Sequence, residues 1–217
     1  MMFLDMVIAI DGPAGAGKTT AAKLLADRLG FVYLDTGAMY RTITLYALRN
    51  GIPPEDAEAL AEALKNEVDI EIRNDKVYLN GEDVSSYIRS REVTKFVPMV
   101  STHKKVREIM VLKQREFAIG KDIVVEGRDI GTVVFPDAEL KIYLNAAVKE
   151  RARRRWKEEE ARGDMYNLQE IEKDIAERDK IDTSRTHAPL KVAEGAVILD
   201  NTNLSIKEEI DMLVSLV

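Results

Sequence analysis

Three glycines and a lysine–threonine pair near the start of the chain have the spacing of a phosphate-binding loop. Residues 12–20 read Gly-Pro-Ala-Gly-Ala-Gly-Lys-Thr-Thr and match the pattern G-x-x-x-x-G-K-[ST]. Glycine lets the backbone of such a loop turn, so that successive N–H groups point at phosphate oxygens. Lys18 would contact the β- and γ-phosphates of a nucleotide, and the Thr19 hydroxyl would bind the Mg²⁺ ion that bridges them. These residues predict a nucleotide site.

Arginines form a second group of residues that suits phosphate chemistry. The planar guanidinium matches the charge that phosphoryl transfer spreads over several oxygens. Three of the arginines have i, i+3 and i+4 spacing, which places them on one face of a helix. A solvated basic face, balanced by the glutamates at 158–160, is the alternative interpretation. The arginines that stand out are Arg41, Arg107, Arg128, Arg151, Arg154, Arg155, Arg178 and Arg185.

Short apolar runs alternate with amphipathic segments along the chain. The apolar runs predict strands too apolar to face water on either side, at residues 7–11, 31–35, 123–126, 140–144 and 196–199. The amphipathic segments predict helices at 18–29, 39–49, 55–66, 104–119, 149–162 and 168–180, and a last helix that starts at Ser205 with Glu208 as its capping-box partner. This alternation favours an α/β fold with a parallel five-stranded sheet flanked by helices. Ligands of such sheets bind at the carboxyl ends of the strands, where Asp11, Asp35, Glu126 and Asp200 fall.

One segment departs from this alternation of strand and helix patterns. Residues 68–87 alternate like exposed strands, with turns expected at 74–75 and 80–81. We interpret the segment as a small antiparallel β insert. Periodicity alone does not distinguish a functional insert from a hairpin without a role in the site.

Composition narrows the class of protein. The 217 residues are 46% hydrophobic, enough for a sizeable core, and we expect a single domain over residues 1–217. The net charge of −6 argues against a general affinity for nucleic acid. The absence of cysteine excludes disulfides and thiolate metal sites. No basic leader or run of about 20 apolar residues is found, so we expect a cytoplasmic protein without a membrane segment.

Several motifs together resemble one known family. They are Ile-Asp-Gly-Pro with the phosphate-binding loop from residue 10, Asp-Thr-Gly-Ala-Met-Tyr-Arg at 35–41, Val-Arg-Glu at 106–108, Glu-Gly-Arg-Asp-Ile-Gly-Thr-Val-Val-Phe-Pro at 126–136, Glu-Arg-Asp at 177–179, and Leu-Asp-Asn-Thr at 199–202. With these motifs the chain resembles the bacterial-type cytidylate kinases, in the P-loop nucleoside monophosphate kinase group. The resemblance runs from residue 7 to nearly the last residue.

The resemblance implies a P-loop kinase core, a β insert at 67–90 that binds the monophosphate, and a helical lid at 150–168. It implies transfer of the γ-phosphate of ATP to CMP or dCMP with Mg²⁺, by a protein that we expect to be a monomer. The catalytic residues implied are Lys18, Arg128, Arg151 and Arg155. ATP would be bound by Gly12, Pro13, Ala14, Gly15, Ala16, Gly17, Lys18, Thr19, Thr20 and Arg154, with Thr19 on the metal. CMP would be bound by Asp35, Thr36, Arg41, Arg107, Arg128, Asp129, Arg178, Asp182 and Arg185.

Other functions stay open at this stage. A P-loop kinase with another acceptor, such as UMP, AMP or a small metabolite, would share Lys18, Thr19 and the lid arginines. A non-catalytic ATP-binding module would bind without turnover. A GTPase is disfavoured because no Asn-Lys pair, which guanine recognition would need, occurs in the chain. Pro98 stands where the family has a small hydroxyl residue, which predicts looser discrimination between CMP and UMP.

Overall fold

The computed structural model describes residues 6–73, 75–161 and 167–217. They divide into two compact units, which are described separately: a first unit of residues 6–33 and 120–217, and a second unit of residues 34–119. The prediction of one domain over residues 1–217 stays a prediction. The turn at 74 and the loop at 162–166 of the predicted lid lie outside the described residues.

A parallel five-stranded sheet forms the centre of the first unit and confirms the predicted fold class. Its strand order is β2-β6-β1-β7-β8. The strands are β1 (Val7–Asp11), β2 (Val32–Asp35), β6 (Ile123–Gly127), β7 (Leu140–Asn145) and β8 (Val197–Asp200). β1 lies at the centre and pairs in parallel with β6 and β7. As predicted, Asp11, Asp35, Glu126 and Asp200 all fall at carboxyl ends of strands.

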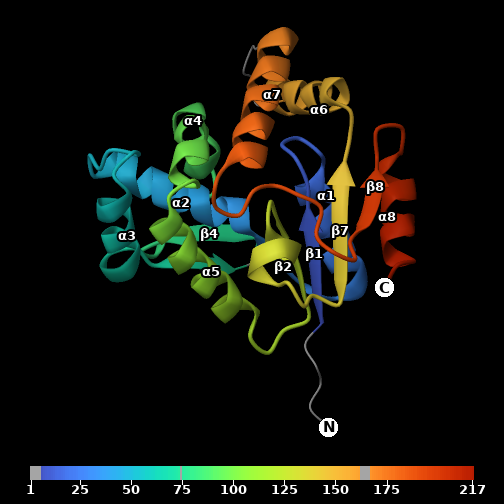
Figure 1. Ribbon diagram of the computed structural model, residues 1–217, viewed down its shortest axis with the longest axis horizontal. Helices are drawn as coiled ribbons and strands as arrows, with labels where there is room; N and C mark the ends of the chain where they lie inside the picture. Colours follow the sequence, from blue (N-terminus) through green and yellow to red (C-terminus); the bar gives the residue numbers. More distant parts are fainter. Residues whose placement is uncertain (1–5, 74, 162–166) are drawn as a thin grey trace. The chain divides into compact units, whose positions relative to one another are not determined.

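The helices of this unit lie at the positions that the amphipathic patterns predict. They are α1 (Lys18–Leu29), α6 (Val148–Glu160), α7 (Leu168–Ser184) and α8 (Ile206–Val214). Ile10, Leu25, Ile142 and Leu213 belong to one buried cluster, which joins α1 and α8 to the strands. α6 and α7 pack on each other beyond the carboxyl end of β7 (Figure 1). The predicted capping box of α8 is present, with both the Ser205 and Glu208 side chains engaged.

The prediction that all five strands are buried on both faces is wrong for β8 and for the start of β2, where Val32 is 38% exposed. Val197 and Ile198 are 37% and 61% exposed. β8 is an edge strand that pairs only with β7 in the sheet order. An apolar run of this kind therefore identifies a strand without showing that both of its faces are covered.

The second unit consists of helices and the small antiparallel sheet. Its helices are α2 (Thr36–Arg49), α3 (Ala57–Asn66), α4 (Arg91–Val100) and α5 (Lys104–Ala118), with a short 3-10 turn η1 (Tyr87–Arg89). The strands β3 (Ile70–Arg73), β4 (Lys76–Leu79) and β5 (Glu82–Asp83) pair antiparallel in that order and confirm the predicted insert. Asn80 and Gly81 both have positive φ, as a tight hairpin turn requires.

α4 is a helix that the sequence patterns did not predict. The Ser90 hydroxyl accepts a hydrogen bond from the N–H of Val93 and so caps its start. Pro98 lies inside the helix, where proline lacks the N–H that would bond to the preceding turn. In the described part of the chain, no helix is long and apolar enough to cross a membrane.

Candidate active site

The phosphate-binding loop joins the end of β1 to the start of α1. A Cβ on Gly12 would lie 2.1 Å from the carbonyl oxygen of Leu144 in β7, so only glycine fits where the loop leaves the strand. Gly17 caps α1 in the left-handed conformation. The loop therefore places Lys18 and Thr19 in the first turn of α1, where backbone N–H groups favour an anion.

Lys18 is buried beneath this loop. Its side chain donates a hydrogen bond to the carbonyl oxygen of Pro13 at 2.7 Å. Burial, and then the positive charge of Arg128, lower the pKa of Lys18 from its ordinary 10.5 to about 7. The charge of Arg178 acts in the same direction, while Glu126 and Asp182 oppose it. Three cations are thus close enough to influence one another around the loop.

Arg128 belongs to an ion network that extends from the end of β6 to α7. Its Nε donates to Oδ2 of Asp182 at 2.8 Å. Arg185 lies 3.6 Å from Asp182 and 3.9 Å from Asp129. Burial acts to raise the pKa of Asp182, but the arginine charges outweigh it and the pKa lies below its usual value. This network holds charged groups in fixed places in a largely dry environment.

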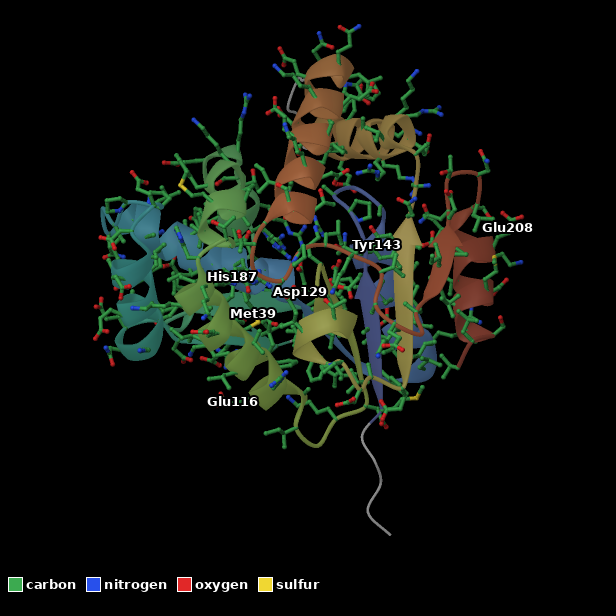
Figure 2. The ribbon with its side chains drawn as sticks, viewed as in Figure 1. Met39, Glu116, Asp129, Tyr143, His187 and Glu208 are labelled. Carbon is green, nitrogen blue, oxygen red and sulfur yellow. The ribbon has the colours of Figure 1, made fainter. Side chains whose placement is uncertain are left out.

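Asp11 supports the segment that carries Arg128 and Asp129. It ends β1, is 3% exposed, and accepts hydrogen bonds from the N–H groups of Ile130 at 2.7 Å and Gly131 at 2.8 Å. These two residues open the π-helical turn η2 (Ile130–Val134), directly after Asp129. Figure 2 shows Asp129 in this segment and Tyr143 on the neighbouring strand β7. The carboxylate of Asp11 thereby ties the root of the phosphate-binding loop to the start of this turn.

The three arginines of α6 that were predicted to share one helix face have different surroundings. Arg151 is buried and donates to the carbonyl oxygens of Ala14 and Ala146. Arg154 donates to the side chain of Asn201 at 2.9 Å and to its carbonyl oxygen at 2.8 Å. Arg155 pairs with glutamates of its own helix. Arg151 and Arg154 therefore contact the phosphate-binding loop and the segment after β8, whereas the pairing of Arg155 matches the solvated-face interpretation.

Asn201 also contacts the loop. It is fully buried, and its amide donates to the carbonyl oxygen of Ala16 and to Oε1 of Glu209, each at 3.0 Å. Burial raises the pKa of Glu209. The loop is thus held on this side by a residue of α8 acting through Asn201.

In the second unit, Asp35 organises the start of α2. Its Oδ1 accepts from the N–H of Ala38 at 2.9 Å, and Oδ2 accepts from Nη2 of Arg41 at 2.5 Å. Arg89 lies 3.7 Å from the same carboxylate. Burial acts to raise the pKa of Asp35, but Arg41 and Arg89 outweigh it and lower the pKa.

Thr36 and Arg107 are also buried in the second unit. Arg107 donates to the carbonyl oxygen of Ser101 at 3.1 Å, and its guanidinium lies 5.6 Å from the ring centre of Tyr40. The aromatic face and the carbonyl fix the direction of the guanidinium.

The donor set near the loop suits a metal that arrives with a nucleotide. Within the described ranges, no three His, Cys, Asp or Glu residues gather as a metal centre. Mg²⁺ characteristically takes one or two protein oxygens and completes its shell with water and phosphate. The half-buried Thr19 offers a hydroxyl, and the buried carboxylate of Glu126 accepts a hydrogen bond from Tyr33 at 2.6 Å. These residues fit Mg²⁺ bound to nucleotide phosphates.

Comparison with known proteins identifies the family. The family model described as cytidylate kinase matches residues 8–217. The chain belongs to the cytidylate kinase family. A cytidylate kinase of Geobacillus sp. (strain WCH70) is 50% identical over 214 residues, covering 97% of this chain and 95% of the relative. One from Caldanaerobacter subterraneus subsp. tengcongensis is 48% identical over 211 residues, covering 97% and 94%.

Solved structures of lower identity share the fold of this cytidylate kinase family member. An uncharacterized protein from Eubacterium ventriosum ATCC 27560 matches with a TM-score of 0.56 and 10% identity, covering 98% of each chain. A gluconokinase from Sinorhizobium meliloti 1021 matches with a TM-score of 0.51 and 12% identity, covering 99% of this chain and 92% of that one. At such identities the likeness concerns the fold alone.

The structure groups many of the predicted site residues within each unit. Lys18, Arg128, Arg178 and Asp182 interact in the first unit, and Asp35 and Arg41 pair in the second. Arg155 is the predicted catalytic residue whose recorded ion pairs lie within its own helix. The roles predicted for all these residues stay predictions.

Sequence reasoning assigned no role to four residues that the structure places at these groups. Glu126 and Asp179 could have been noticed, because the first ends a strand and the second lies in the Glu-Arg-Asp motif. Asn201 lies in the Leu-Asp-Asn-Thr motif, so it too could have been noticed. Arg89 carries no such signal, since its partner Asp35 is distant along the chain.

Proposed function

We propose that this member of the cytidylate kinase family transfers the γ-phosphate of Mg²⁺-bound ATP to CMP and dCMP, giving ADP and CDP or dCDP. The observation that carries the proposal is the buried Lys18, whose pKa is lowered first by burial and then by the charges of Arg128 and Arg178. Cations held together in a dry site repel one another, and a polyphosphate would relieve that repulsion. A site of this kind binds and stabilises anionic phosphates.

Each part of the site has a role in this reaction. The loop of residues 12–20 binds the ATP phosphates, Lys18 stabilises the charge on the transferring group, and Thr19 binds Mg²⁺. Arg128 and Arg151 add positive charge in the transition state, and Arg154 contributes to ATP binding. For the predicted role of Arg155, its guanidinium has to leave the glutamates of α6 with which it pairs. Mg²⁺ supplies further charge neutralisation when it is bound. No general base is needed, because the phosphate of CMP is already ionised near neutral pH.

The acceptor is proposed to be recognised by polar side chains that match the hydrogen-bonding pattern of cytosine. Cytosine presents an amino donor at N4 and acceptors at N3 and O2, which suits acceptors such as Asp129 and Thr36 beside the donor Arg107. Uracil reverses the pattern at N3 and O4, so the same site would leave polar groups unpaired with UMP. Asp182 would accept from a ribose hydroxyl. The acceptor phosphate would be held by Arg41, Arg128 and Arg185, with Asp35 and Arg178 supporting the site.

The reaction is tested by measuring ADP formation with Mg-ATP and CMP, dCMP, UMP, AMP or no acceptor at matched concentration. We expect turnover led by CMP and dCMP, and its loss when EDTA removes Mg²⁺. Turnover led by UMP or AMP would support kinase activity but overturn the assignment of cytosine as the base that the site recognises. Turnover with none of them would overturn the proposal.

The oligomeric state and the cellular location of the enzyme are part of the same proposal. We propose that it acts as a monomer in the cytoplasm. Light scattering at working concentration tests the first point, with a molar mass near the 24.4 kDa of one chain as the expected result.

A further inference from the structure

The carboxylate of Asp179 lies against the phosphate-binding loop, although no role described above requires an acid there. Its Oδ1 accepts a hydrogen bond from the N–H of Ala14 at 3.2 Å. Its Oδ2 accepts one from Nη1 of Arg151 at 2.6 Å. One carboxylate on α7 therefore contacts both the loop and α6.

Arg151 contacts the other polar group of the Ala14 residue. Its Nη1 also donates to the carbonyl oxygen of Ala14 at 2.8 Å, and its Nε donates to the carbonyl oxygen of Ala146 at 2.9 Å. The Arg151 side chain is 5% exposed, and that of Asp179 is 19% exposed. The N–H and the C=O of Ala14 are thus both bound by a charged pair that is largely shielded from water.

The next residue of the loop fits closely against α6. Gly15 has a left-handed φ of 72°, and a Cβ there would lie 3.1 Å from the carbonyl oxygen of Arg151. The backbone of α6 therefore approaches the loop directly. The conformation of the loop at Ala14 and Gly15 depends on how α6 and α7 are held.

We infer that Asp179 is a positioning residue for phosphoryl transfer, which fixes the guanidinium of Arg151 and the Ala14 peptide in the geometry that the reaction uses. The inference rests on the proposed function and deepens it. Charge-assisted hydrogen bonds in a dry site are strong and directional. A phosphate site whose groups are held before the substrate arrives needs less reorganisation in the transition state.

The first test compares Asp179→Asn with Asp174→Asn, an exposed acid on the same helix. Asparagine keeps an acceptor for Ala14 but turns the ion pair with Arg151 into a weaker contact. With saturating Mg-ATP and CMP, we expect kcat to fall at least about tenfold in Asp179→Asn, with the KM for CMP within about twofold of the parent. Asp174→Asn should match the parent. A lowered Tm with kcat unchanged per folded molecule would mean a merely structural role and would overturn the inference.

A double variant tests whether Asp179 acts through Arg151. If it does, Arg151→Met combined with Asp179→Asn should be about as slow as Arg151→Met alone, because the two residues act as one unit. A further loss equal to the whole effect of Asp179→Asn would contradict this.

A measurement without turnover keeps the inference separate from the proposed function. By NMR, exchange of the Ala14 amide hydrogen should be at least about fivefold faster in Asp179→Ala than in the parent or in Asp174→Ala. Equal exchange rates would overturn the contact between Asp179 and the loop. A parent protein without CMP-dependent turnover would instead overturn the proposed function and leave the exchange result to decide the contact.

Discussion

Lys18 is a charged group that the folded protein holds at an energetic disadvantage. Its folded pKa of about 7 lies below the 10.5 of an exposed lysine, so folding disfavours the charged form. This destabilisation is complete below pH 7 and disappears as pH rises towards 10.5. We expect Lys18→Met to raise the free energy of unfolding by about 2–4 kcal/mol at pH 7, and much less at pH 10.

The same variant should lose activity while it gains stability. A charge aimed at the transferring phosphate is worth several kcal/mol, so kcat should fall at least about a hundredfold. Lys207→Met, on the exposed face of α8, is the matched control for urea denaturation at both pH values. A Lys18→Met protein less stable than the parent at pH 7 would show that the burial of this lysine is not a net destabilisation.

ATP binding should restore the proton on Lys18. The polyphosphate adds negative charge beside a lysine whose pKa is about 7, so its pKa rises on binding. Near pH 8 the parent should therefore take up a fraction of a proton per ATP, beyond any uptake by a variant without this lysine. Calorimetry of Mg-ATP binding in two buffers of different ionisation enthalpy measures the uptake. Equal uptake by Lys18→Met would assign the proton to another group.

At the scale of elements, Asp11 links β1 to the turn η2, and this link should depend on pH. Burial raises the pKa of Asp11 to about 6, against 3.8 for the exposed group. The folded protein therefore favours the protonated form, and the contribution of Asp11 to stability falls as pH rises from about 4 to 6. Asp11→Asn cannot titrate, so it should lack this fall of about 2–3 kcal/mol.

Urea denaturation at pH 4, 5, 6 and 7 measures the difference in free energy of unfolding between Asp11→Asn and the parent. That difference should shift in favour of the variant as pH rises to about 6, and then stay level. Asp27→Asn, an exposed substitution on α1, should give no such trend. A constant difference for Asp11→Asn would mean that Asp11 does not titrate in this range.

The sequence predicted those elements whose signals lie within a few neighbouring residues. The capping box at Ser205 and the strand–loop–helix around Lys18 depend on residues within a few positions of each other. α4 was missed because Pro98 is usually a helix breaker, and the Ser90 cap at the other end of the helix was not recognised. Pro98 lies near the end of α4, and the helix packs on α2.

At the scale of the whole molecule, the contacts that support the phosphate-binding loop join residues far apart in the sequence. Ala14 and Asp179 are 165 positions apart, and Ala16 and Asn201 are 185 apart. Such pairs depend on the order of the strands in the sheet and on which helices the chain then places beside the loop. No local pattern encodes that, so the supporting contacts of the loop became visible only in the folded chain.

The proposed cytosine contacts of Arg107 and Asp129 predict the same kinetic signature for Arg107→Ala and Asp129→Ala. Each variant should raise the KM for CMP at least about tenfold and change the KM for ATP little, because each removes a proposed contact to the base alone. Lys104→Ala, on the exposed side of α5, is the control. Steady-state kinetics with each substrate varied in turn measures both constants. If only one variant showed the effect, the other residue would lie outside the cytosine site, whereas equal rises in both KM values would indicate damage to the fold.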